Sequence, residues 1–134
     1  MDKLLVFSDG AARGNPGPAA IAYVFVKNNK IIESSSSYIG KTTNNSAEYR
    51  AIIYALMEAK KYSDRNLIIH SDSQLVIRQL NNIYKVRKKH LQAYYDKIQE
   101  LKTQFKDIEF KHVKRNHKFI QECDRLCNLT LDKQ

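Results

Sequence analysis

Four carboxylates occupy distinctive positions in an otherwise basic sequence: the acids are Asp9, Glu48, Asp72 and Asp124. Asp9 follows an apolar run and precedes a turn rich in glycine and proline, and Asp72 follows a second apolar run. Glu48 and Asp124 lie in segments with the residue pattern of helices. A basic protein attracts polyanions, and acids that must lie close to a polyanion usually hold a cation between themselves and it. The four acids therefore predict a cation site.

The formal net charge is +9, from 23 basic and 14 acidic residues. The excess is uneven, because residues 84–118 contain 11 Lys and Arg against 4 Asp and Glu. Such density suits contacts with phosphate groups and predicts binding that weakens strongly with salt. The alternative is a solvated helix face, since a basic run alone carries little specificity.

The length of 134 residues and an apolar fraction of 43% predict one globular domain over residues 1–134. No apolar stretch approaches the ~18 residues of a membrane span, and no secretory segment precedes the first predicted strand. We therefore expect a soluble, cytoplasmic protein without a membrane partner, whose thiols are reduced. Because no feature indicates an obligate interface, a monomer is expected.

Other chemistries have less support in the sequence. A zinc site made by His117, Cys123 and Cys127 lacks a fourth ligand with matching spacing, and apolar neighbours indicate core packing instead. A serine nucleophile lacks the G-x-S-x-G pattern, and a phosphate-binding loop lacks G-x-x-x-x-G-K-[ST]. Acids that offer only oxygen, without histidine partners, favour Mg²⁺ or Mn²⁺ over zinc.

The elements that must position these acids follow from the hydrophobic pattern. Strands are predicted over residues 3–9, 19–26, 30–39, 67–70 and 108–113, with a hairpin turn at Asn28–Asn29. Helices are predicted from a cap within residues 42–45 to Ala59, from Asp72 or Ser73 to Leu80, over 88–105 and over 119–131. The order predicts an α/β protein with a mixed sheet and helices on its faces.

Active sites in such sheets gather at the carboxyl ends of parallel strands. If the first and fourth strands are parallel neighbours, Asp9 and Asp72 project from the same edge. One strand spacing is about 4.8 Å, which brings two carboxylates close enough to share a metal ion.

Four motifs occur in order along the chain, each around one of the acids. They are Asp9-Gly-Ala-Ala-Arg-Gly-Asn-Pro-Gly, Thr43-Asn44-Asn45-Ser46-Ala47-Glu48, Ser71-Asp72-Ser73-Gln74 and Cys123-Asp124-Arg125-Leu126. In order and spacing, over nearly the whole length, the chain resembles the type 1 ribonuclease H (ribonuclease HI) family. The resemblance is to a short form, because the segment Lys85-Val86-Arg87-Lys88-Lys89 leads directly into the next predicted helix without the longer basic protrusion.

The resemblance implies a ribonuclease H-like fold, with a five-stranded mixed sheet flanked by helices on both faces. It also implies an endonuclease that hydrolyses the RNA strand of RNA–DNA hybrids and leaves 5′-phosphate and 3′-hydroxyl ends. Two Mg²⁺ or Mn²⁺ ions per site would be held by Asp9, Glu48, Asp72 and Asp124, with Asp9 and Asp72 bridging. One ion would activate the attacking water and the other would stabilise the departing oxygen.

The resemblance assigns further residues to the substrate. Asn15, Asn44 and Asn45 resemble minor-groove contacts at which the 2′-hydroxyl marks RNA, and turn or cap roles are the alternative. Lys41 and Thr43 would form a phosphate pocket for the DNA strand. His117 matches a mobile histidine that assists water activation or product release, and a plain surface histidine is the alternative.

Two other functions stay open from the sequence. The same fold could serve a non-catalytic nucleic-acid-binding module, although all four acids are present, or a nuclease for double-stranded RNA. The segment before Asp124 departs most from the family pattern, because Ile120 stands where relatives often carry Asn.

Overall fold

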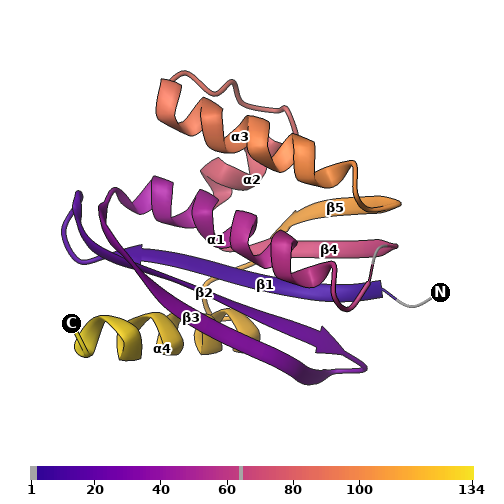
Figure 1. Cartoon of the computed structure of the whole chain (residues 1–134), viewed down its shortest axis with the longest axis horizontal. Coiled ribbons are helices and arrows are strands. Elements are labelled where there is room, and N and C mark those ends of the chain that lie inside the picture. The colour runs from indigo at the N-terminus through magenta and orange to yellow at the C-terminus, as the bar shows by residue number, and fades with distance from the viewer. Residues whose placement is uncertain (1–2, 64) are drawn as a thin grey trace.

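The computed structural model describes residues 3–63 and 65–134. Strands and helices follow one another in the predicted order (Figure 1). They are β1 (Lys3–Ala12), β2 (Gly17–Lys27), β3 (Lys30–Thr42), α1 (Asn44–Ala59), β4 (Asn66–Ser71), α2 (Gln74–Leu80), α3 (Lys89–Lys102), β5 (Asp107–His112) and α4 (Lys118–Asp132). Within the described residues, no helix is both long and apolar enough to cross a membrane.

The strands form one five-stranded mixed sheet in the order β3-β2-β1-β4-β5. β1 pairs antiparallel with β2 and parallel with β4, and β4 pairs parallel with β5. The predicted α/β fold and the parallel pairing of the first and fourth strands are both confirmed. The turn at Asn28 and Asn29 is also confirmed, since both residues have the positive φ, 51° and 61°, of a tight two-residue hairpin turn.

Helices cover both faces of the sheet. α1, α2 and α3 lie on one face and α4 lies on the other (Figure 1). Successive side chains of a strand point to opposite faces. In β1, Leu4 and Val6 therefore pack in the core under α1, whereas Leu5 and Phe7 pack against α4. The central strand is thus held on both sides, which gives a rigid base for any residue at its end.

β1 is longer than predicted, and Asp9 lies inside the strand instead of at its end. The antiparallel ladder with β2 continues to the pair Ala12–Ala19, whereas the parallel ladder with β4 stops at Phe7–His70. Asp9 therefore stands just beyond the point where β1 and β4 separate. The sequence predicts the strand to end where the apolar run ends. The small residues that follow carry no strand pattern and are held in the strand by pairing with β2 alone.

Candidate metal centre

Three of the predicted acids converge where β1 and β4 separate, at the carboxyl end of β4. One ligand oxygen from each of Asp9, Glu48 and Asp72 lies within 4.8 Å of the others. Asp9 comes from β1, Asp72 follows β4, and Glu48 comes from the first turns of α1. Three carboxylates at this separation, which offer oxygen only, form a donor set suited to a hard divalent cation.

Glu48 reaches the strands because α1 lies directly on Gly10. The Gly10 amide donates a hydrogen bond of 2.8 Å to Oε1 of Glu48. A Cβ at Gly10 would lie only 2.2 Å from the carbonyl carbon of Ala47 and 2.5 Å from the amide nitrogen of Glu48. The glycine after Asp9 therefore sets how closely the helix, and with it the third carboxylate, approaches the sheet.

Asp124 lies at the same cavity but outside the group of three. A cavity of about 210 Å³ is lined by Asp9, Glu48, Asp72 and Asp124 together with Gly10, Ala11, Asn44, Arg115 and Ile120. Asp124 is exposed on α4, and the Nδ2 of Asn128 donates to its Oδ2 at 3.4 Å. The fold therefore brings all four predicted acids to one cavity, of which Asp124 is the exposed member. Ile120, at the position that departs from the family pattern, lines the same cavity.

Negative charge is crowded in this cavity. Burial, and then the carboxylates of Asp72 and Asp124, raise the pKa of Asp9 from 3.8 to about 8. Burial and the carboxylates of Asp9 and Asp72 raise the pKa of Glu48 well above its ordinary value. The Gly10 amide and the Arg115 guanidinium act in the opposite direction on both acids. A divalent cation among these oxygens would favour the ionised forms, so the residues fit a metal ion.

We expect the metal-free protein to lose stability as pH rises from about 4 to about 8. Folded Asp9 keeps its proton up to about pH 8, whereas the unfolded chain releases it near 3.8. The folded state binds more protons between these values, so the free energy of unfolding falls as pH rises. Urea denaturation in EDTA measures this as the difference between wild type and Asp9→Asn, which reports the titration of Asp9 together with its effect on the neighbouring Glu48. A difference that does not change with pH would contradict the expectation, and Mg²⁺ should reverse the trend.

Arg115 is a site residue to which the sequence assigned no role of its own. Its Nε lies 3.2 Å from Oδ2 of Asp72, although the arginine side chain is 91% exposed and the Asp72 side chain only 8% exposed. Arg115 lies in the segment between β5 and α4, so it reaches the cavity from the solvent side. In the sequence, Arg115 is only one of many basic residues. No sequence pattern shows which of them lies close to Asp72.

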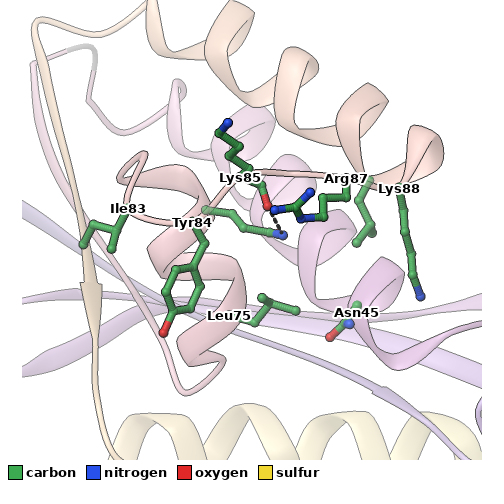
Figure 2. Close-up of a pocket in the computed structure, with 9 residues that line it drawn as sticks. Asn45, Leu75, Ile83, Tyr84, Lys85, Arg87 and Lys88 are labelled. Atoms are coloured by element: carbon green, nitrogen blue, oxygen red, sulfur yellow. Dashed lines mark hydrogen bonds between the residues drawn. The ribbon is translucent and has the colours of Figure 1, made fainter.

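A groove of about 690 Å³ with a basic rim lies between the start of α1, α2 and the start of α3. Its lining comprises Asn45, Leu75, Gln79, Ile83, Tyr84, Lys85, Arg87, Lys88 and Leu91. Figure 2 shows Lys85, Arg87 and Lys88 around the groove, with Leu75 and Tyr84 along it. Residues 85–88 lead straight into α3 at Lys89, as the sequence predicts for a short form without the protrusion.

Comparison with known proteins decides the family. A family model described as reverse transcriptase-like matches residues 7–129. A ribonuclease HI from Haemophilus ducreyi is 32% identical over 141 residues, covering 96% of this chain and 90% of that protein. The chain belongs to the type 1 ribonuclease H family.

Two longer relatives show the same family in part of their length. A ribonuclease HI from Halobacterium salinarum is 38% identical over 127 residues, covering 94% of this chain and 63% of that protein. A bifunctional protein from Mycobacterium tuberculosis is 35% identical over 132 residues, covering 97% of this chain and 36% of that protein. The chain therefore spans less than two thirds of the length of these two relatives.

Solved structures confirm the ribonuclease H fold. The RNase H1 from Halobacterium salinarum superposes with a TM-score of 0.92 at 36% identity, over 98% of this chain and 99% of that chain. LC11-RNase H1, in complex with an RNA/DNA hybrid, superposes with a TM-score of 0.90 at 36% identity, over 97% of each chain.

In this member of the ribonuclease H family, His117 is the N-cap of α4. Its Nδ1 accepts a hydrogen bond from the amide of Phe119 at 3.2 Å, and its ring stacks on Phe7 with 4.8 Å between centroids. The structure therefore gives His117 a capping role. Participation of His117 in catalysis stays a prediction.

The predicted substrate residues surround the start of α1. Oδ1 of Asn15 accepts from the amide of Asn44 at 2.9 Å, and Oδ1 of Asn44 accepts from the amide of Ala12 at 3.4 Å. Thr43 caps α1 by accepting from the amide of Ser46 at 3.2 Å. Asn15 and Asn44 thus hold the turn, which is the alternative role predicted for them, and Thr43 provides the helix cap.

The same surface also agrees with a role in binding. Asn15 and Asn44 are exposed, Lys41 is exposed near the end of β3, and Asn45 lines the basic groove. The bonds above occupy the carboxamide oxygens of Asn15 and Asn44, and the amide nitrogens are the groups suited to donate to a ligand. Substrate contact by these residues stays a prediction.

Both cysteines lie in the core between α4 and the sheet, as predicted. Sγ of Cys123 donates to the carbonyl oxygen of Phe7 at 3.4 Å, and Sγ of Cys127 donates to that of Asp9 at 3.6 Å. Burial raises the pKa of each thiol. The thiols therefore pack α4 against the strand that carries Asp9 and are not arranged as reactive groups or zinc ligands.

Proposed function

We propose that this protein is an endoribonuclease that hydrolyses the RNA strand of RNA–DNA hybrids with divalent metal ions. The observation that carries the proposal is the meeting of Asp9, Glu48 and Asp72 within 4.8 Å on a ribonuclease H fold. The hybrid bound to LC11-RNase H1 supports the choice of substrate. A binding module without catalysis would not need three carboxylates crowded so closely that burial and repulsion oppose their ionisation.

We propose two Mg²⁺ or Mn²⁺ ions per site, held by Asp9, Glu48, Asp72 and Asp124. When bound, such a pair supplies a clamp on the attacking and departing oxygens of an in-line phosphodiester hydrolysis. The protein supplies the rigid placement of the acids, because Asp9 lies on β1, Asp72 directly follows the parallel neighbour β4, and Gly10 lets the helix of Glu48 approach closely. Arg115 adds a positive charge beside Asp72, on the side from which a phosphate would approach.

Substrate binding would combine a surface that recognises the RNA strand with a basic groove that binds phosphates. Asn15, Asn44 and Asn45 would donate to the minor groove of the hybrid, where the 2′-hydroxyl distinguishes RNA from DNA. Lys41 and Thr43 would contact a phosphate of the DNA strand, and the groove rim would contact phosphates further along. Double-stranded RNA is the second candidate substrate, because its strands also carry 2′-hydroxyls.

Cleavage of matched duplexes tests the proposal. One labelled RNA strand is annealed to DNA or to RNA, and a DNA–DNA duplex of the same sequence is included. Each is incubated with purified protein in Mg²⁺, in Mn²⁺ or in EDTA. We expect cleavage of the RNA in the hybrid only with metal, and 5′-phosphate ends on the products. Binding of the hybrid without cleavage in either metal would favour the non-catalytic module instead.

Replacing Lys85 and Lys88 with Gln should weaken hybrid binding while leaving kcat nearly unchanged. Both residues line the groove and are not among the residues that line the cavity of the four acids. Each lost phosphate contact lowers the slope of log Kd against log salt by about 1. Fluorescence anisotropy with a labelled hybrid at several salt concentrations measures the slope.

The matched control replaces Lys60 and Lys61 with Gln, two adjacent exposed lysines at the end of α1. This control removes the same net charge away from the groove. An equal loss of affinity in both variants would show that the overall charge, and not the groove, determines binding.

A further inference from the structure

Asn128 of α4 lies between the fourth carboxylate and an arginine of the β1–β2 turn. Its Nδ2 donates to Oδ2 of Asp124 at 3.4 Å and to the Asp124 carbonyl oxygen at 3.1 Å. Its Oδ1 accepts from Nη2 of Arg13 at 3.2 Å. The same Arg13 nitrogen lies 2.6 Å from Oδ1 of Asp132. Arg13 and Asn128 are 115 positions apart in the chain, so only the fold creates this connection.

The hydrogen-bonding capacities of Arg13 and Asp124 explain why an amide suits position 128. A guanidinium only donates hydrogen bonds and an ionised carboxylate only accepts them. A side-chain amide offers an acceptor and a donor on one rigid plane, so it can join the two. The partners also fix the orientation of the amide, with oxygen toward Arg13 and nitrogen toward Asp124.

The turn that carries Arg13 is also tied to the other helix of the site. Asn15, two residues further along, accepts from the amide of Asn44 at the start of α1. The turn therefore contacts the helix that carries Glu48 on one side and the helix that carries Asp124 on the other. A displacement of this turn would change the spacing of both carboxylates.

We propose that Asn128 is a positioning residue which, anchored by Arg13, holds the exposed Asp124 carboxylate toward the other three acids for metal binding. The inference rests on the proposed function. Asp9, Glu48 and Asp72 are held by the strands β1 and β4 and by the Gly10 amide, whereas Asp124 is exposed on α4. An exposed carboxylate needs a hydrogen-bond partner to restrict its rotamers. A residue that orients a metal ligand in this way strengthens metal binding without contacting the metal itself.

A purely stabilising role does not account for the connection. The side chains of Arg13 and Asp132 are 45% and 63% exposed, and ion pairs at that exposure contribute little to stability. Loss of the connection should therefore change metal affinity much more than the melting temperature.

Mn²⁺ binding to the full chain without substrate tests the proposal. The free ion is measured by electron paramagnetic resonance for wild type, for Asn128→Leu, which has a similar volume without the amide, and for Asn128→Ala. We expect both variants to bind the more weakly held ion about 10-fold less tightly. Their kcat for a hybrid should recover at high Mn²⁺, with the KM for the hybrid and the melting temperature unchanged. Arg13→Lys, which keeps a donor, should retain more affinity than Arg13→Met.

Lys61→Gln, which removes an exposed ion pair with Glu58 elsewhere on the surface, serves as the control and should match wild type. Wild-type Mn²⁺ affinity in Asn128→Leu would overturn the positioning role and leave the proposed function intact. A loss of affinity that only accompanies a fall in melting temperature would overturn it as well. If wild type neither binds Mn²⁺ nor cleaves a hybrid, the proposed function fails, and the positioning role fails with it.

Discussion

Asp72→Asn is expected to lower the rate of hybrid cleavage in Mg²⁺ by about 10³-fold or more, because it removes one charged oxygen from the proposed metal site. Stabilisation by bound metal ions supplies several kcal/mol to a hydrolysis of this kind, and each 1.4 kcal/mol is a factor of ten in rate. Asn has nearly the same shape as Asp. Its side-chain oxygen can still accept the hydrogen bond that Nε of Arg115 donates to Oδ2 of Asp72 at 3.2 Å in the wild type. The change therefore isolates the loss of charge. Single-turnover cleavage of a labelled hybrid measures it.

The fold of the Asp72→Asn protein should be preserved, and its melting temperature in EDTA should equal or exceed that of wild type. The reason is that the substitution removes one of the carboxylates that repel Asp9 and Glu48. Cleavage of the hybrid by the variant at the wild-type rate would contradict the proposed metal mechanism. A variant that unfolds in EDTA would show that Asp72 holds the structure together.

Gly10→Ala is expected to lower the free energy of unfolding by about 3 kcal/mol, at the upper end for overpacked sites. The added methyl group would lie 2.2 Å from the carbonyl carbon of Ala47, which is backbone and cannot rotate away. α1 must move outward, and the hydrogen bond from the Gly10 amide to Glu48 is lost or weakened. Urea denaturation measures the stability, and Mn²⁺ binding should weaken together with it.

Gly40→Ala is the matched control for Gly10→Ala. Gly40 has a φ of +82°, and a Cβ there would meet nothing within 4 Å. Its cost comes only from the backbone conformation, about 1 kcal/mol, with no change in metal affinity. If Gly10→Ala costs no more than Gly40→Ala, the close seating of α1 on β1 does not position Glu48.

Much of this molecule could be predicted from the order and pattern of its residues. The alternation of apolar runs and helical stripes determined the order of strands and helices, and the Asn28–Asn29 pair determined the first hairpin. Local patterns suffice there because each element is selected by its own periodicity and turn residues. The acids Asp9 and Asp72 could be placed together because parallel neighbours end at the same edge of a sheet.

The tertiary structure alone decided which of the many polar side chains serve the acids. Arg115 is one of 23 basic residues, and its pairing with Asp72 spans 43 positions of the chain. Asn128 looks like any exposed helix residue until the β1–β2 turn brings Arg13 to it. The depth of Asp9 inside β1 depends on where two different ladders stop. Periodicity records which face of an element is buried, but it contains no information about which distant side chain lies opposite. The sequence therefore determined the acids and the strands that carry them, and long-range packing determined how those acids are neutralised and held.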